Sequence, residues 1–364
     1  MKWQVLPGPA FFLDGVVQLL REGMSVVVAA PSRGTPEIGT GVCDLLAEQR
    51  WSFKHIVVST TQDPLLWVTE QMYIEPESWM RWSVESLCQQ MDGTSVMVIE
   101  GVDTTNWDAW RGFLKEFEVA SRQRPSDDRP LLLVVVRGVA RKSLHLSGGA
   151  LEVRQWIDVL GEYDTLIYVD QLLRSSRKPP KHHKLMVRQI SALALWDLDL
   201  ARYLASQPER LLFDVKTVLK AARAALDNSS ALKDEAWEAG GSEQVDGAEM
   251  THPFVLVEKD DPERELGRRL WTAQAAELLP MIEVRRRELL KGIGRHLACP
   301  FDLDGVSVRS LDELEIGRLA FATQRHGLKG DLRTRAEWLA GCRNKLAHLS
   351  ALNSSEALDA RMYG

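Results

Sequence analysis

The stretch Ser25–Ala30 (SVVVAA), followed by Pro31–Thr40 (PSRGTPEIGT), decides the fold expected for the first half of the chain. The apolar run after Ser25 is typical of a strand that is buried in a parallel sheet. The glycines and prolines that follow predict a loop, and Gly41–Gln49 then has the spacing of a helix. Strand, glycine loop and helix, in this order, form the arrangement that a phosphate-binding loop requires.

Further apolar segments alternate with helical segments along the first half. Gly23 ends the first of these helices, because glycine favours the left-handed conformation found just after a helix. Apolar strands separated by helices predict a mostly parallel sheet covered on both faces. The expected fold class over residues 1–175 is therefore a P-loop NTPase-like α/β domain. The predicted strands are His55–Ser59, Ser95–Ile99, Pro130–Val136 and Asp164–Val169, and the predicted helices are Phe12–Glu22, Glu77–Met91 and Trp107–Ser121.

The loop keeps the glycine spacing of a phosphate-binding loop but not its reactive groups. Gly34 and Gly39 are placed as in the pattern G-x-x-x-x-G. The next two positions should supply a lysine for the phosphates and a hydroxyl for magnesium. They are Thr40 and Gly41 instead. The loop therefore lacks the cation that phosphate binding normally uses.

Other changes argue against ATP hydrolysis. Pro36 lacks the N–H that a phosphate cradle would use, and Glu37 adds a repelling negative charge. An apolar run ends at Glu100-Gly101, where hydrolytic relatives carry an acidic pair, so the water-activating carboxylate is missing. We expect no hydrolysis and no required cofactor, while nucleotide binding without hydrolysis stays open. Its contacts would come from Gly34, Gly39, Thr40 and Glu100.

Two segments carry a resemblance to a known family: LPGPAFFLDGVVQLLREGMSVVVAAP (Leu6–Pro31) and VMVIEGVDTTNWDAWRGFLKEF (Val96–Phe117). Together with the lysine-less loop, they resemble the inactive STAND-type P-loop modules of bacterial antiphage systems. The resemblance covers about the first half of the chain. It implies a module that senses or docks a partner, and a helical lid or winged-helix unit after it.

The middle of the chain, residues 176–260, is expected to be that helical unit. Leu185–Ala225 has helical spacing interrupted at Pro208, and no basic recognition helix stands out. The basic segment Arg174–Lys184 is interpreted as a solvated connector rather than a phosphate-contacting patch. Residues 227–250 are rich in Gly, Ser and acidic side chains, which predicts a flexible linker or a long exposed loop. Thr251–Lys259 could form a wing-like strand.

The last part, residues 261–364, is predicted to be an up-and-down helical bundle without strands. A first helix starts after Asp261, is kinked or interrupted at Pro280 and resumes over Met281–Leu297. A second helix over Ser310–Gln324 is expected to begin with a capping box, and the last helix covers Leu332–Leu349. The run Arg285, Arg286 and Arg287 predicts a basic surface that could steer RNA.

The bundle ends in RNKLAH, which covers Arg343–His348. Asn344 and His348 are four residues apart and share a helix face, whereas Leu339, Cys342, Leu346 and Leu349 form an apolar stripe. An arginine followed five positions later by a histidine, with asparagine next to the arginine, resembles the Swt1-like branch of the HEPN superfamily. This resemblance implies a metal-independent ribonuclease in which Arg343, Asn344 and His348 are catalytic and two copies of the chain form a homodimer.

Two interpretations of this motif stay open. In the first, an imidazole moves a proton and the guanidinium of Arg343 neutralises charge on the phosphate. In the second, the protein is a non-enzymatic scaffold or adaptor of a multi-protein defence complex, and the motif is a dimer contact. An ATPase with an unusual loop is a third, weaker alternative.

Composition restricts the setting in which either function would operate. The net charge of −6 and pI near 5.8 argue against a general nucleic-acid coat. Four scattered cysteines, without a paired spacing, predict neither a disulfide framework nor a zinc site. No signal peptide or long apolar run is found, so we expect a cytoplasmic protein without a membrane span.

Overall fold

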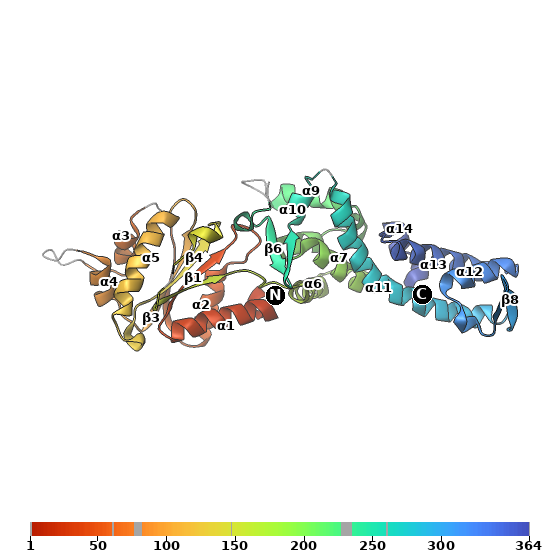
Figure 1. The fold of residues 1–364 in the computed structure, drawn as a ribbon, viewed down its shortest axis with the longest axis horizontal. Helices are drawn as coiled ribbons and strands as arrows, with labels where there is room; N and C mark the ends of the chain where they lie inside the picture. Colours follow the sequence, from red (N-terminus) through yellow and green to blue (C-terminus); the bar gives the residue numbers. More distant parts are fainter. Residues whose placement is uncertain are drawn as a thin grey trace. The chain divides into compact units, whose positions relative to one another are not determined.

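The computed structural model describes residues 2–59, 62–75, 82–146, 148–226, 235–259 and 261–363. The chain divides into two compact units, which are described separately below. Figure 1 gives the labels of the helices and strands used in both descriptions. Unit 1 contains residues 1–168, 195–199 and 229–255, and unit 2 contains residues 169–194, 200–228 and 256–364. The three domains expected over 1–175, 176–260 and 261–364 stay a prediction.

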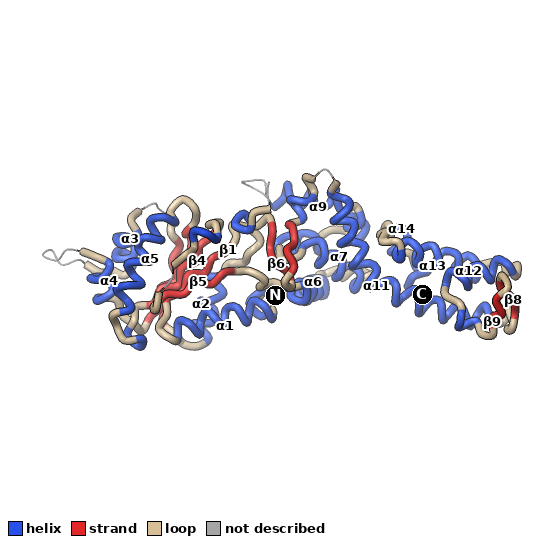
Figure 2. Tube along the Cα trace, in the orientation of Figure 1, coloured by secondary structure: helices blue, strands red, loops and turns tan. Residues whose placement is uncertain are grey.

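Unit 1 is built on a five-stranded parallel sheet with the order β2-β3-β4-β1-β5. Figure 2 draws its strands in red and labels β1, β4 and β5. The central strands β1 and β4 are buried almost along their whole length, as their apolar sequences predict. The predicted parallel α/β sheet is therefore confirmed. The strands are β1 (Ser25–Ala30), β2 (Ser52–Val57), β3 (Ser95–Val102), β4 (Leu131–Arg137) and β5 (Leu151–Gln155).

Helices cover both faces of this sheet. Trp110 and Phe117 belong to the large core between the sheet and one group of helices, α3 (Pro64–Gln71), α4 (Val84–Gln90) and α5 (Trp107–Arg122). The helices α1 (Pro7–Arg21) and α2 (Ile38–Glu48) pack together and against β1 and β2. Gly23 has φ +75° and follows the end of α1, as predicted. Of the helix predicted over 77–91, residues 77–81 lie outside the described residues.

The fifth strand is not the one that was predicted. Asp164–Val169 lies inside helix α6 (Glu162–Ser175), and the strand at the sheet edge is β5. The burial pattern explains the error: Asp164, Thr165, Tyr168 and Val169 are buried while Ile167 is exposed, which is a helical period. A short apolar run does not distinguish a helix from a strand by itself.

Part of the expected acidic linker is a hairpin in unit 1. A 3₁₀ turn (Trp237–Ala239) leads into the antiparallel strands β6 (Ser242–Val245) and β7 (Ala248–Thr251). Asp246 and Gly247 both have positive φ, at 50° and 78°, as a type I′ turn requires. The linker prediction is wrong for this hairpin, and residues 227–234 lie outside the described residues. The prediction of a wing-like strand over 251–259 is also wrong, because residues Pro253–Leu256 form helix α10.

Unit 2 is mostly helical, as predicted. Helix α11 (Pro262–Ile293) is 32 residues long, continues through Pro280, and packs against α7 (His183–Ala194) and α13 (Asp331–Ala347). The segment predicted as one helix from Ser310 is a 3₁₀ turn (Leu311–Glu313) followed by α12 (Ile316–Arg325). The other helices are α8 (Leu198–Ala205, which starts in unit 1), α9 (Val215–Leu226), α14 (Ser354–Ala357) and α15 (Ala360–Tyr363), with a 3₁₀ helix at Glu209–Phe213.

Unit 2 also contains strands, contrary to the prediction of a purely helical bundle. Strands β8 (Phe301–Leu303) and β9 (Val306–Val308) form a second antiparallel hairpin. Its turn is again Asp-Gly, with φ +55° at Asp304 and +81° at Gly305. Both hairpins were thus marked in the sequence by the dipeptide that favours a type I′ turn.

Candidate functional site

The glycine loop connects the carboxyl end of β1 to the first turn of α2. Gly34 has φ +76°, and a Cβ added to it would lie 2.9 Å from Nε1 of Trp196. Helix α2 begins at Ile38, not at Gly41 as predicted, so Gly39 and Thr40 belong to its first turn. Their backbone N–H groups therefore lie at the helix end that attracts anions.

The carboxylate of Glu100 occupies this helix end. Its Oε1 accepts a hydrogen bond of 3.1 Å from the N–H of Gly39, and its Oε2 lies 2.9 Å from Nε2 of His55. A Cβ on Gly39 would lie only 2.5 Å from Cδ of Glu100, so glycine is required for this close approach. The protein's own carboxylate thus binds where a phosphate-binding loop would receive an anion.

A bulge in β3 determines the direction of Glu100. The register shifts between Ile99, which pairs with Val134, and Val102, which pairs with Val136. Gly101 has φ +88° within this irregularity. A bulge re-aims the neighbouring side chain, and here that side chain is Glu100.

Arg137, at the end of β4, binds the loop from another side. Its guanidinium donates to Oγ1 of Thr35 and, over 2.7 Å, to the carbonyl oxygen of Pro36. Burial lowers the pKa of Arg137, while the carboxylates of Glu100 and Glu37 act in the opposite direction. Arg137 supplies the local positive charge that the missing lysine would have supplied, but its donors bind the loop itself.

The start of the loop is anchored to a buried polar group in the same unit. Nε of Arg33 lies 3.8 Å from the carboxylate of Asp197, which is also 3.1 Å from Nε2 of His252. The guanidinium of Arg33 lies over the ring of Phe254, and Trp196 packs edge-on against His252. His252 is fully buried and Asp197 almost so. The loop is therefore held at both ends by contacts within unit 1.

This arrangement disfavours phosphate chemistry more strongly than the sequence alone suggested. A phosphate approaching the N–H of Gly39 would have to displace Glu100. The guanidinium of Arg137 is already bonded to loop atoms. His55 and Arg137 were not predicted as members of this site, and no local sequence pattern marks them, because each comes from a separate strand.

The second predicted site, RNKLAH, lies at the end of helix α13. Arg343 forms an ion pair with Glu315, with 3.0 Å between Nη2 and Oε2. Asn344 and His348 are exposed, and within the described part of the chain their side chains form no hydrogen bond. His348 is the C-cap residue, and its backbone N–H donates to the carbonyl of Asn344 over 3.0 Å. The structure thus brings Asn344 and His348 to one exposed helix end and turns Arg343 toward Glu315.

The apolar stripe under this motif is mostly as predicted. Leu339, Cys342 and Leu346 are buried, and Trp271 of α11 donates to the carbonyl of Leu346 over 2.6 Å. Burial raises the pKa of the Cys342 thiol to about 12. Leu349 is not part of the stripe: it lies beyond the helix with φ +59° and is 67% exposed.

The three arginines expected to steer RNA differ in their surroundings. Arg285 donates to the carbonyl of Met362 and pairs with Glu288. Arg286 is buried and donates to the carbonyl of Leu314 over 2.9 Å. Arg287 is the exposed member, with Nε 3.4 Å from Glu283. Most of the charge in this run is therefore paired within unit 2.

A shallow hollow of about 390 Å³ lies beside Arg343. Its charged lining contains more carboxylates than guanidinium groups, so this hollow does not present a basic surface. The charged residues are Glu283, Arg286, Asp312, Glu313, Glu315 and Arg343.

Two adjacent histidines at the end of the basic connector, His182 and His183, have different partners. Nδ1 of His182 lies 2.6 Å from Glu209, and Nε2 of His183 lies 2.7 Å from Asp170. Among the residues that the structure describes, no group of three or more His, Cys, Asp or Glu side chains is arranged to hold a metal ion.

None of the helices in the described part of the chain is sufficiently long and apolar to cross a membrane.

Comparison with known proteins gives only distant likenesses. No family model matches the chain, and no curated protein matches it. Among solved structures, a variant of RuvB from Thermotoga maritima is 11% identical, with a TM-score of 0.35; the match covers 71% of this chain and 94% of that one. The Thermotoga maritima RuvB Holliday junction branch migration motor is 10% identical, with a TM-score of 0.34 and coverage of 71% and 93%. These values are too low to bear on function, and the NTPase-like α/β fold of unit 1 rests on its own parallel sheet and strand–loop–helix order.

Proposed function

We propose that this chain is a bacterial defence protein in which a non-hydrolysing P-loop-like module controls a C-terminal HEPN-type, metal-independent endoribonuclease. The observation that supports the nuclease best is the exposed end of helix α13. There Asn344 and His348 face solvent together, one turn apart, next to Arg343. Their exposure leaves them accessible to a phosphodiester.

The proposed reaction needs no metal. A base takes the proton of the ribose 2′-hydroxyl, and the 2′-oxygen attacks the adjacent phosphorus. The bond to the 5′-oxygen breaks, an acid returns a proton to that oxygen, and a cyclic phosphate remains. The imidazole of His348 suits either proton transfer, and the guanidinium of Arg343 suits the charge that develops on the phosphate.

The reaction profits from two imidazoles, whereas one chain contributes a single His348. We therefore propose a homodimer through the HEPN-type part, in which each copy supplies one histidine to a shared site. Arg343 would exchange its surface ion pair with Glu315 for the RNA phosphate. Such exposed pairs contribute only about 0–1 kcal/mol, so the exchange costs little.

The role proposed for unit 1 follows from the glycine loop between β1 and α2, at which one of the protein's own side chains fills the anion site. Because the carboxylate of Glu100 occupies the anion site and the guanidinium of Arg137 is bonded to loop atoms, this module is suited to docking another protein of the same defence system rather than to turning over a nucleotide. Nucleotide binding without hydrolysis would require displacement of Glu100.

A non-enzymatic scaffold is the second candidate, and particular contacts favour it. Arg343 is engaged by Glu315, the neighbouring hollow is rich in carboxylates, and Arg285 and Arg286 are bonded within the chain. In this case the motif would be a dimer contact, and the protein would act by holding partners together.

An RNA cleavage assay separates the two candidates. Purified wild type should cleave total RNA in the presence of EDTA, and His348→Ala and Arg343→Ala should each abolish cleavage while mass and fold are kept. His326→Ala is a matched control, since His326 is also an exposed C-cap residue, at the end of α12. Cleavage that persists in the doubly substituted protein would refute the nuclease. A folded wild type that does not cleave but co-purifies with its partners would support the scaffold.

A further inference from the structure

Strand β5 leaves one edge of the sheet in unit 1 without a neighbouring strand among the described residues. It is the last strand in the order β2-β3-β4-β1-β5. The N–H of Ser25 donates to the carbonyl of Ala150, and the N–H of Trp156 donates to the carbonyl of Ala29. In a parallel pair, these two bonds place the backbone groups of the even-numbered β5 residues toward β1. The odd-numbered residues therefore direct their N–H and C=O groups outward.

The outward groups belong to Leu151, Val153 and Gln155. Gln155 is exposed and Val153 is half-buried, whereas Leu151 is only 2% exposed, so the end of β5 at Leu151 has to open before its groups can pair with another strand. Within the described ranges the N–H groups of these residues have no acceptor, and the carbonyl of Gln155 receives one bond, from Ile157. An unpaired edge of this kind is a template for adding a strand.

The sequence of β5 is complementary to itself in one antiparallel register. With Val153 opposite Val153 of a second copy, Glu152 of each copy lies opposite Arg154 of the other. In this register Val153 pairs with Val153 and Leu151 with Gln155, and the backbone groups of these pairs exchange hydrogen bonds. The Glu152–Arg154 pairs occupy the non-hydrogen-bonded positions, at which side chains are closer together. Neither Glu152 nor Arg154 has an ion-pair partner among the residues described, so both are available for such pairing.

The neighbouring registers are electrostatically unfavourable. Only the odd-numbered residues of β5 have outward backbone groups, so the register between the two strands can shift only in steps of two residues. The two neighbouring registers place Glu152 opposite Glu152 or Arg154 opposite Arg154. Like charges directly opposite each other are destabilising, whereas opposite charges contribute favourably. Charged residues usually protect an edge strand from pairing, but here their signs select a single register.

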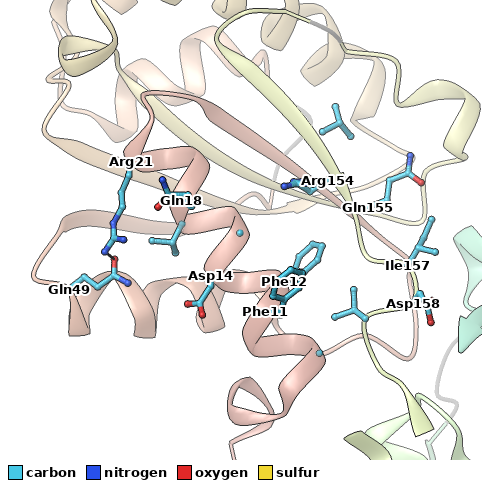
Figure 3. Close-up of a pocket in the computed structure, with 15 residues that line it drawn as sticks. Phe11, Phe12, Asp14, Gln18, Arg21, Gln49, Arg154, Gln155, Ile157 and Asp158 are labelled. Carbon is cyan, nitrogen blue, oxygen red and sulfur yellow. Dashed lines mark hydrogen bonds between the residues drawn. The ribbon is translucent and has the colours of Figure 1, made fainter. Parts of the chain in front are cut away.

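The surroundings of the edge also suit a second copy. An open groove of about 910 Å³ runs between β5 and helix α1. Figure 3 shows Phe11 and Phe12 on the helix side, and Arg154 and Gln155 on the strand side, of this groove. Phe11 is 84% exposed, so pairing across a two-fold axis could cover apolar surface that is otherwise in water.

We propose that two copies of the chain pair through their β5 strands, antiparallel and centred on Val153, to form one continuous sheet. The interface is isologous, because the same strand and the same two charge pairs occur on both sides. This surface belongs to unit 1 and is separate from the dimer contact proposed for the HEPN-type part.

Charge reversal and mixing test this proposal. Glu152→Arg and Arg154→Glu each create two like-charge pairs, and we expect the dissociation constant of the β5 contact to rise about 10- to 100-fold. In analytical ultracentrifugation, each variant should have a lower mass than wild type. An equimolar mixture of the two variants should restore that mass, because each protomer then meets opposite charges. The variant with both substitutions should also restore it.

Backbone and surface controls complete the experiment. Val153→Pro removes an outward N–H without breaking a bond to β1, and it should lower the mass while circular dichroism stays unchanged. Glu22→Arg, an exposed charge reversal just after α1, should leave the mass unchanged. Equal masses for wild type and all variants, or a mixture that fails to restore the mass, would overturn the proposal. Such results would leave the proposed ribonuclease untouched, because RNA cleavage is measured separately.

Discussion

Replacing Glu243 by glutamine should remove a pH-dependent part of the stability of unit 1. Glu243 lies in β6 and is only 4% exposed. Burial raises the pKa of its carboxyl from 4.5 to about 7, against the hydrogen bonds donated by the N–H of Gln244 and by Nε1 of Trp237. The folded protein therefore holds a proton on Glu243 at pH values at which the unfolded chain has released it.

The magnitude follows from the two pKa values. The difference between 4.5 and about 7, at about 1.4 kcal/mol for each pH unit, is on the order of 3 kcal/mol. Because the folded pKa is raised, this contribution is fully present below pH 4.5 and is lost as the pH rises through 7. Glutamine takes up no proton in this range. The difference in unfolding free energy between wild type and Glu243→Gln should therefore change by about 3 kcal/mol across this interval.

Urea unfolding, followed by tryptophan fluorescence, measures this difference in unfolding free energy. The measurements are made at several pH values below, between and above the two pKa values of 4.5 and about 7. Both side-chain oxygens of Glu243 accept a hydrogen bond, whereas the amide nitrogen of glutamine cannot accept one. A further loss of about 1–3 kcal/mol that does not depend on pH is therefore expected, and the slope is the diagnostic quantity. Glu249→Gln is the matched control, since Glu249 is exposed on the other strand of the same hairpin. Parallel pH profiles for wild type and Glu243→Gln would refute the reasoning.

Three other substitutions, one of them a control, probe the sites described above. Glu100→Ala frees the N–H of Gly39 and removes a negative charge, so a fluorescent ATP analogue should bind on the order of tenfold more tightly than to wild type; equal affinities would show that Glu100 does not close the loop. Arg286→Ala should lower the unfolding free energy by about 2–3 kcal/mol, because it leaves the carbonyl of Leu314 without its buried donor. Arg287→Ala, at an exposed position, should change it by less than about 0.5 kcal/mol, and thermal or urea unfolding of the two variants would contradict this account if their losses were similar.

Helices and strands could be told apart from the sequence where a periodic pattern of apolar residues extends over a long segment or where a strand is completely buried. Ser25–Ala30 is the strand β1 with the predicted bounds, because an apolar run flanked by Gly and Pro fits a central strand. Asp164–Val169 was misread because its apolar run is short, and β5 was missed because an edge strand with Glu152 and Arg154 lacks that apolar character. The hairpins were missed although both carry Asp-Gly turns, so these strands could have been found from sequence.

For the glycine loop, the sequence predicted only that the groups needed for phosphate chemistry are missing. The sequence shows that lysine is absent after Gly39, since this follows from the residue types alone. That Glu100 fills the vacated anion site depends on a bulge in β3, and that Arg137 holds the loop depends on the position of β4 beside β1. Neither follows from a local pattern.

The sequence by itself therefore determined the periodicities, the parallel sheet, the helical second half and the missing phosphate-binding groups. Tertiary structure alone decided which charges meet: Glu100 with Gly39, Glu315 with Arg343, and Arg286 with the carbonyl of Leu314. The physical reason is that helix and strand preferences act between residues a few positions apart. Hydrogen bonds and ion pairs instead depend on distances of about 3 Å between groups that only the folded chain brings together.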